Sequence, residues 1–409
     1  MWAKRVARNT GWLALGEIVV KTTLLLSGIM VARWLGPGAM GLFTVSYGFA
    51  LILTQFMAAG QVEVLIREVA RAPDAARSLH REAFAWQRSF HLAMIILTAV
   101  GILVIAHGAL RWTLMAFLPY AWARARLITA AAVFRGLERM DIDVGSRAIE
   151  KLIGLVTVVV VGAAGGEIWI VGIGLTLGAL LGNLWMARSL ARLPVAEVVN
   201  IPRQSELRKE GVVFLGLSTS FQILTRGDGL VLAALGIASA TIGQYGAALT
   251  PVLAVLALPQ ILAIAIYPAL SQAAAAGKKA WKWALGAAGI GGAIGVLAAI
   301  LLVAARQPVI GLLFGADFSA AELVLARAAW LLPGACAAML AGIVLASWRR
   351  QRRGLWIVSI TALATIVADV LVVPTAGILG AATVAVAAHS AEAALAVVAG
   401  LLISGDRAL

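Results

Sequence analysis

Residues 10–32 read TGWLALGEIVVKTTLLLSGIMVA, an apolar stretch that carries an acid, Glu17, and a base, Lys21. Such a stretch is long enough to cross the ~30 Å hydrocarbon core of a bilayer as a helix. A charge at the bilayer centre costs roughly 2.5–3.5 kcal/mol on insertion scales, so it persists only where it is paired or lines a wet cavity. The stretch therefore predicts a membrane helix with one face on a polar interior.

The composition extends this interpretation to the whole chain. It has 409 residues, of which 62% are hydrophobic and 13% charged, and its mean hydropathy is +0.97. A chain this apolar is predicted to be an all-α, polytopic membrane protein, because open backbone is not tolerated in lipid. The single cysteine, Cys336, cannot form an intramolecular disulfide, and no Cys/His cluster indicates a metal.

Twelve segments are long and apolar enough to be membrane spans. They are residues 10–32, 41–62, 89–107, 112–134, 147–164, 168–187, 211–235, 243–267, 281–304, 324–346, 355–374 and 378–403. The first resembles a signal peptide but carries charges and lacks a small-residue cleavage site, so we expect it to be retained. The fourth contains Arg124, Arg126 and Pro119, so its assignment as a span depends on the distribution of basic residues in the loops.

Basic residues alternate between successive loops. Most of the 33 lysines and arginines lie near residues 4–8, 67–88, 135–151 (with Arg147 and Lys151), 188–209, 278–282, 349–353 and 407. The other loops hold little beyond Arg33, Arg111 and Arg306. By the positive-inside rule, both termini are predicted to be cytoplasmic in the plasma (inner) membrane, and the fourth span is needed. This orientation explains the net charge of +14 without a nucleic-acid partner.

The two halves of the sequence echo each other. Leu35-Gly36 and Gly41-Leu42-Phe43 return about 200 residues later as Leu235-Gly236 and Gly243-Gln244-Tyr245. We predict an N-terminal six-helix lobe over residues 1–200 and a C-terminal one over residues 201–409. Both lobes would start in the cytoplasm, so they are parallel repeats. Such duplication is typical of transporters, whose site lies between the repeats near mid-membrane.

Two groups of small or rigid residues are predicted to be structural. Arg33, Pro37 and Gly41 belong to the outer turn after the first span, where Gly and Pro fix the backbone. The ninth span is rich in glycine, which predicts close helix packing. Its glycines are Gly286, Gly289, Gly291, Gly292 and Gly295. No Walker-type lysine follows them, so they are not a phosphate-binding loop.

Several further motifs follow in order along the chain. They are Asn9-Thr10-Gly11-Trp12, Ala32-Arg33-Trp34-Leu35-Gly36-Pro37, Arg135-Gly136-Leu137-Glu138-Arg139-Met140, Thr225-Arg226-Gly227-Asp228, Gly243-Gln244-Tyr245-Gly246, Pro268-Ala269-Leu270-Ser271, Leu313-Phe314-Gly315-Ala316-Asp317-Phe318 and Pro374-Thr375-Ala376-Gly377. Their order and placement resemble the polysaccharide-transporter family. Its members are the oligosaccharide-lipid flippases of the multidrug/oligosaccharidyl-lipid/polysaccharide exporter superfamily. The resemblance covers nearly the whole chain, which is short for this family.

The resemblance implies two six-helix lobes around a central cavity that works by alternating access. The implied substrate is a polyprenyl-pyrophosphate-linked oligosaccharide, which moves from the cytoplasmic to the outer leaflet during synthesis of O-antigen, capsule or exopolysaccharide. Implied partners are membrane lipids and the polymerase and glycosyltransferases of the same pathway, and we expect a monomer. A polar cavity would replace the water that sugar and phosphate groups lose in hydrocarbon.

Four buried bases are the candidate substrate-binding residues. Arginine suits a phosphate because its fork donates in pairs and stays charged, whereas lysine supplies a point charge. The candidates are Lys21, Arg124, Arg226 and Arg126. Arg124 and Arg126 are two positions apart, about 200° on a helix, so only one of them is expected to face the cavity squarely.

Four other residues are candidates for gating or ion coupling: Glu17, Asp228, Glu392 and His389. Glu17 and Lys21 are spaced i, i+4, so they form either a simple pair or part of the cavity. Asp228 could meet Lys21 across the lobes. His389 and Glu392 share a helix face and are compatible with a proton or sodium site. Asp369 is predicted to lie near the outer end of its helix. There, exposure to water accounts for a charged side chain at least as well as a functional role does.

Other functions fit the residues less well. No nucleotide motif is present, so we expect neither a cofactor nor an enzyme, and energy would come from a proton or sodium gradient, the membrane potential or product consumption. A multidrug or cation antiporter of the same superfamily should favour acids over bases in its cavity. A lipid II flippase usually carries two further helices. A membrane glycosyltransferase or ligase needs a large outer loop, and the outer loops here are short.

Overall fold

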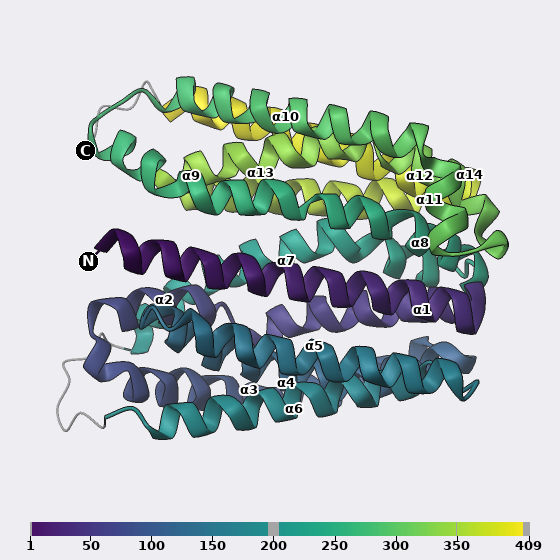
Figure 1. Cartoon of the computed structure of the whole chain (residues 1–409), viewed down its shortest axis with the longest axis horizontal. Helices are drawn as coiled ribbons and strands as arrows, with labels where there is room; N and C mark the ends of the chain where they lie inside the picture. Colours follow the sequence, from purple (N-terminus) through teal and green to yellow (C-terminus); the bar gives the residue numbers. More distant parts are fainter. Residues whose placement is uncertain (1, 195–203, 349, 404–409) are drawn as a thin grey trace. The chain divides into compact units, whose positions relative to one another are not determined.

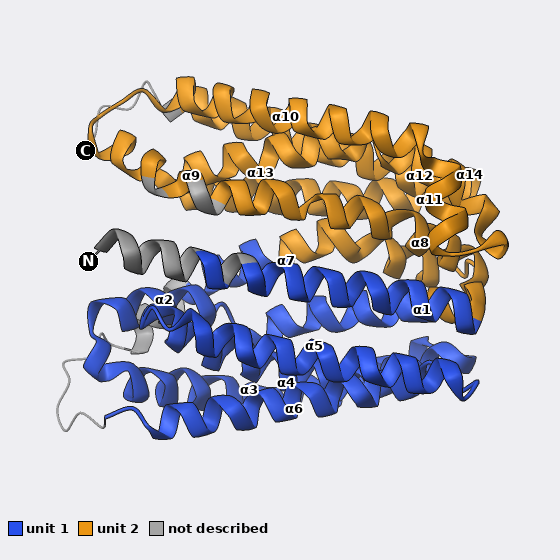
Figure 2. Ribbon diagram, viewed as in Figure 1, with its two compact units in different colours: residues 1–35, 42–219 blue, residues 36–41, 220–409 orange. Residues whose placement is uncertain are grey.

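The computed structural model describes residues 2–194, 204–348 and 350–403. The basic residues Arg203, Arg349 and Arg407 and the predicted lobe boundary at residue 200 lie outside these ranges. Every regular element in the described residues is a helix, in agreement with the predicted fold class (Figure 1). The helices form two compact units, residues 1–35 with 42–219 and residues 36–41 with 220–409 (Figure 2).

Unit 1 holds the first six predicted spans and the start of the seventh. Its elements are α1 (Trp2–Ala58), α2 (Gln61–Arg71), the 3-10 helix η1 (Pro73–Ala75), α3 (Ala76–Ile105), α4 (Gly108–Gly136), α5 (Met140–Ala163), α6 (Trp169–Ala191) and the start of α7 (Gln204–Ala234). Its packing centre is α4, which contacts both α5 and α6. The side chains that α4 buries are mostly small, so neighbouring helices approach closely.

Unit 2 contains the rest of α7 and the C-terminal helices. They are α8 (Ser239–Val255), α9 (Ala257–Ala275), α10 (Ala280–Ala304), α11 (Arg306–Leu313), the 3-10 helix η2 (Ala316–Phe318), α12 (Ser319–Ala328), α13 (Leu331–Ser347) and α14 (Gln351–Ile403). The predicted eighth span is divided between α8 and α9 at Leu256. The predicted tenth span is not straight, because α12 and α13 meet at an angle of 49°.

The two longest helices are each interrupted by a glycine. Gly36 in α1 has φ 79° and Gly377 in α14 has φ 56°, a left-handed conformation that favours glycine. Figure 1 shows α1 running out from the N-terminus and returning, so it contains the two predicted spans 10–32 and 41–62. By length and composition alone, six helices among the described residues could cross a membrane, or seven if the bent pair is one span. The predicted spans that this test leaves out include α4, α5 and α7, which carry the buried charges.

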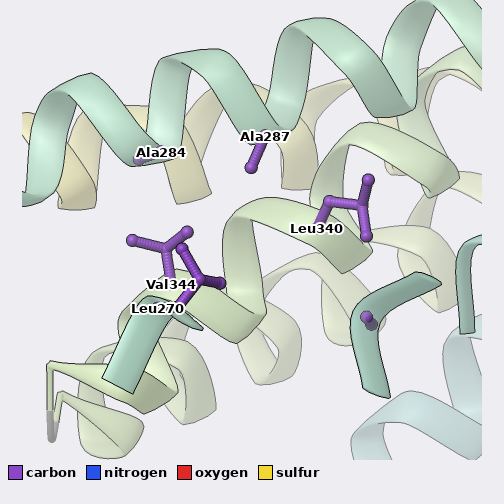
Figure 3. Packing of buried hydrophobic residues seen from close by; sticks show 6 residues of the cluster. Leu270, Ala284, Ala287, Leu340 and Val344 are labelled. Carbon is purple, nitrogen blue, oxygen red and sulfur yellow. The ribbon is translucent and has the colours of Figure 1, made fainter. Parts of the chain in front are cut away.

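Glycines of α10 confirm only part of the predicted close packing. A Cβ on Gly291 or Gly295 would collide with backbone atoms of α13, whereas one on Gly286, Gly289 or Gly292 would meet nothing. The same two helices, α10 and α13, share a hydrophobic cluster with α9 (Figure 3). Its labelled members are Leu270, Ala284, Ala287, Leu340 and Val344. Gly291 and Gly295 therefore allow α13 to approach α10 closely, whereas Gly286, Gly289 and Gly292 make no such contact.

The two echoed glycine motifs pack against each other within unit 2. A Cβ on Gly41 would strike the carbonyl of Ser239, and a Cβ on Gly243 would strike the carbonyl of Pro37. The contact is reciprocal, since each motif supplies a glycine that admits the backbone of the other. This explains why the segment 36–41 belongs to unit 2 although the rest of α1 belongs to unit 1.

Candidate functional site

The polar interior of unit 1 is centred on Glu150 of α5, which is fully buried. Its Oε1 accepts hydrogen bonds from the Tyr120 hydroxyl (2.7 Å) and the Lys151 ammonium (2.8 Å), and it pairs with the Arg124 guanidinium. Tyr120 and Arg124 lie one turn apart on α4, so both project toward α5. Three donors thus hold one carboxylate, which is the compensation that a buried charge requires.

Aromatic side chains surround the lysine of this cluster. Lys151 Nζ donates to the hydroxyls of Tyr47 (3.1 Å) and Tyr120 (3.0 Å), whose rings stack at 6.2 Å. A cavity of about 10 Å³ lies against Thr23, Ser27, Tyr47 and Lys151. That volume holds one water molecule at most. With two bases and one acid, the cluster leans positive, as the sequence indicates for this interior.

Arg147 and Lys151, which the sequence placed in the predicted fifth span and also counted with the basic loop residues, lie inside α5, and their side chains are 12% and 5% exposed. Counting them as loop residues was therefore wrong. Arg147 donates to Glu17 of α1 (2.8 Å) and to Asp143 one turn earlier on α5 (3.2 Å). Asp143 also accepts from Arg135 of α4 (3.0 Å). Glu17 therefore ties α1 to α5 in addition to any pairing with Lys21.

Arg126 points to a different neighbour from Arg124. Its guanidinium carbon lies 4.1 Å from the ring centroid of Phe84 on α3 and 4.9 Å from that of Trp122. Cation–π contacts of this kind are worth about 0.5–2 kcal/mol. The two arginines thus serve different sides of α4, as their angular separation of about 200° predicts.

Unit 2 buries a pair of acids. Asp228 of α7 and Asp369 of α14 are 5% and 1% exposed, and each influences the other electrostatically. Asp228 Oδ2 accepts a hydrogen bond from the Tyr245 hydroxyl of α8, but Asp228 Oδ1 and both oxygens of Asp369 have no hydrogen-bond partner among the described residues. Surface solvation of Asp369 is therefore a wrong explanation of its charge.

His389 and Glu392 extend this acidic cluster along α14. His389 Nδ1 lies 3.2 Å from Glu392 Oε2, both side chains are buried, and His389 is within electrostatic reach of Asp228. Across the described residues, no three His, Cys, Asp or Glu side chains are arranged to hold a metal ion. The cluster nevertheless concentrates negative charge where apolar helices surround it, so a proton or a monovalent cation would relieve it.

The other predicted bases are half-buried. Lys21 lies in the first half of α1 in unit 1, and Arg226 lies on α7 in unit 2, and each has an interacting neighbour. The predicted pairing of Lys21 with Asp228 stays a prediction. The residues that sequence reasoning missed are Tyr47, Tyr120, Glu150 and Tyr245. The spacing of Tyr120 and Arg124 was a usable signal, whereas Glu150 and Lys151 read as the edge of a loop.

Local contacts shift the pKa values of two carboxyl groups outside the predicted spans. Two hydrogen bonds from Arg139 lower the pKa of Asp141 at the start of α5. Burial raises the pKa of Glu63 in the amphipathic helix α2, with Arg135 opposing the shift. Neither group belongs to the two buried clusters, so the two pKa shifts reflect burial and neighbouring arginines.

The fold of the chain is similar to that of solved transporters of the MOP superfamily. An inward-facing multidrug resistance MATE family transporter matches with a TM-score of 0.75 at 14% identity, over 96% of this chain and 98% of that one. The lipid II flippase MurJ in its inward closed conformation matches with a TM-score of 0.74 at 14% identity. The match covers 95% of this chain and 89% of MurJ. A MOP superfamily transporter from Pyrococcus furiosus with a binding pocket of reverse polarity matches with a TM-score of 0.68 at 16% identity. The match covers 98% of this chain and 96% of that one.

The sequence assigns the chain to a family. Residues 6–274 match the family described as "Polysaccharide biosynthesis protein". The chain therefore belongs to the polysaccharide biosynthesis protein family. No curated protein sequence matches it.

Proposed function

We propose that the protein is a flippase for a polyprenyl-pyrophosphate-linked oligosaccharide, which it moves from the cytoplasmic to the outer leaflet by alternating access for surface polysaccharide synthesis. The observation that carries this proposal is the family match over residues 6–274. A fold shared with a lipid II flippase supports the transport of a lipid-linked headgroup. The proposal places the chain in the cytoplasmic membrane with both termini inside, and assigns it no enzymatic step.

The headgroup pyrophosphate is proposed to meet Lys21, Arg124 and Arg226, with Arg126 as a secondary contact. The arrangement around Glu150 supports a role for Arg124. Glu150 Oε1 also accepts from Tyr120 and Lys151, so it keeps two donors if Arg124 turns toward a phosphate. Arginine donates to phosphate in pairs, which fixes its orientation as well as binding it.

The acidic cluster of unit 2 is the proposed coupling site. Two buried carboxyl groups that interact, with three oxygens lacking partners, repel each other unless a proton or a sodium ion sits between them. His389 and Glu392 supply a second acceptor pair nearby. Binding of the cation would favour one of the alternating states, and its release would favour the other. Glu17 is proposed to act on gating through Arg147.

Loss of glycan export tests the phosphate-binding proposal. Arg226→Ala is expected to abolish export of the glycan while the protein still inserts in the membrane at its normal level. Arg327→Ala, which removes a basic residue at an outer-side position of α12, is the matched control and should export normally. Normal export by the Arg226 variant would refute the assignment of Arg226.

A cation antiporter is the competing function, and the acidic cluster of unit 2 is the observation that favours it. Vesicles loaded with a fluorescent organic cation distinguish the two. The flippase is expected to leave the cation gradient unchanged, whereas an antiporter would dissipate it. A lipid II flippase is distinguished by offering lipid II and a polyprenyl-linked surface glycan in the same vesicles.

A further inference from the structure

A groove on unit 2 combines an apolar floor with a basic mouth. It has a volume of about 860 Å³ and runs along α9 and α10. Ligand sites commonly have volumes of ~300–1,000 Å³. Leu270 and Ala287, members of the hydrophobic cluster in Figure 3, form the floor, and Trp283, Gly286 and Ile290 form a partly exposed wall. The groove is separate from both buried charge clusters.

The mouth of the groove carries three lysines, Lys278, Lys279 and Lys282. All three are exposed, none forms an ion pair with a described residue, and no acidic residue lines the groove. Lys278 Nζ lies 5.8 Å from the ring of Trp283, which places a cation beside an aromatic wall. Positive charge above an apolar slot fits an anionic amphiphile, whereas a water-soluble anion would leave the slot unfilled.

The backbone that carries the lysines is fixed. Gly277 has φ 67°, and the amides of Gly277 and Lys278 donate to the carbonyls of Ala274 and Ala273, both at 3.0 Å. This pair of bonds is a Schellman motif, which ends α9 and sets the direction of the next residues. Trp348 Nε1 donates to the Lys278 carbonyl (3.3 Å). The basic mouth is therefore held in place on the helices that form the groove.

We propose that this groove binds an anionic glycerophospholipid of the cytoplasmic leaflet, with its phosphate at Lys278, Lys279 and Lys282 and an acyl chain against Leu270 and Ala287. Charge complementarity and the joining of a basic mouth to an apolar floor carry the assignment. The lysine cluster lies where the loop pattern places the cytoplasmic interface, at the depth of a lipid headgroup. A bound lipid would cover the open face of α10.

Native mass spectrometry of the purified full-length protein tests the site. Phosphatidylglycerol, phosphatidylcholine and a polyprenyl pyrophosphate are titrated separately. We expect phosphatidylglycerol to bind at least about tenfold more tightly than phosphatidylcholine, because each lysine near the surface contributes roughly 1 kcal/mol. The triple variant Lys278→Gln, Lys279→Gln, Lys282→Gln should remove this preference. An unchanged preference would overturn the proposal.

A second variant tests the contribution of the apolar slot independently of the lysines. Gly286→Leu should fill the slot, since nothing lies near a Cβ at this position, and it leaves the lysines in place. Gly292→Leu is the matched control, because it is equally open but does not line the groove. Phosphatidylglycerol binding should weaken only in the first. Equal binding by both variants would overturn the groove. If the triple lysine variant lost polyprenyl pyrophosphate binding but kept phosphatidylglycerol binding, the groove would belong to a different lipid.

Discussion

At the scale of single residues, the structure replaces a set of isolated buried charges with two clusters of opposite character. In unit 1, Glu150 is surrounded by donors from Tyr120, Arg124 and Lys151. In unit 2, Asp228 and Asp369 face each other with a single donor, the Tyr245 hydroxyl, among the described residues. In the first cluster all three donors meet Glu150 Oε1, while Oε2 has no partner among the described residues. The second cluster is short of positive charge, which is why we propose it as the cation site.

Glu150→Ala is expected to destabilise the protein by about 3–5 kcal/mol, because it leaves Arg124 and Lys151 as uncompensated buried cations. Thermal unfolding in detergent measures the effect. Glu167→Ala is the control, since Glu167 is exposed and bonded only to the Trp169 indole nitrogen. Equal melting temperatures for the two variants would show that Glu150 does not organise its cluster.

Asp369→Asn is expected to remove the dependence of transport on the driving ion while preserving the fold. The new amide can donate to Asp228, so one acid and one donor replace two acids, and no cation is required. Transport by reconstituted vesicles, measured with and without a proton or sodium gradient, reports the change. Asp317→Asn, an exposed acid of η2, is the control. A variant that still responds fully to the gradient would remove Asp369 from the coupling site.

Some of these residues could be predicted and others could not. Arg124, Arg226 and Asp228 are conspicuous because they interrupt apolar segments. Asp369 also does so, but its partner Asp228 is far away in sequence, and only the fold of unit 2 brings them together. Arg147 and Lys151 were counted with the basic loop residues although the predicted fifth span begins at residue 147, and the helix in fact starts at Met140.

At the scale of helices, turns and close contacts depend on particular glycines. Gly36 and Gly377 divide the longest helices, and Gly41 and Gly243 admit each other's backbone neighbours. Hydropathy and length alone pick out six or seven spans among the described residues and leave out α4, α5 and α7. They do not predict the bend between α12 and α13, since both sides of the bend are apolar and the bend is set by packing.

Gly41→Leu is expected to prevent correct folding of unit 2, because its side chain would collide with the Ser239 carbonyl. Gly38→Leu should be tolerated, since a Cβ at Gly38 meets nothing. The fraction of each variant that elutes as a monodisperse species after detergent extraction measures the difference. Similar recovery of both variants would contradict the close contact between the two echoed motifs.

At the scale of the whole molecule, two helical units share a fold with MATE transporters and MurJ, and the family match concerns polysaccharide biosynthesis. The fold class follows from composition because lipid admits few architectures. The substrate does not follow from the fold, because proteins with this fold include a multidrug transporter and a lipid II flippase. The basic loops predict the orientation, which is open to direct measurement.

The orientation is tested by labelling single cysteines in a Cys336→Ala background. Asp74→Cys in η1 is expected to react with a membrane-impermeant maleimide only after the cells are permeabilised. Asp317→Cys in η2 should react in intact cells, because the basic loops predict that this turn is on the outer side. Both native side chains are exposed. Labelling of Asp74→Cys in intact cells would reverse the predicted topology.

The most direct test of the proposed function is translocation of a polyprenyl-pyrophosphate-linked oligosaccharide in vesicles that contain only this protein. Exposure of the glycan on the far leaflet can be read with an impermeant lectin or glycosidase. We predict translocation by the wild-type protein, its loss in Lys21→Ala and Arg226→Ala, and its retention in Arg327→Ala. No translocation above protein-free vesicles, with transport of an organic cation in its place, would contradict the assignment as a lipid-linked oligosaccharide flippase.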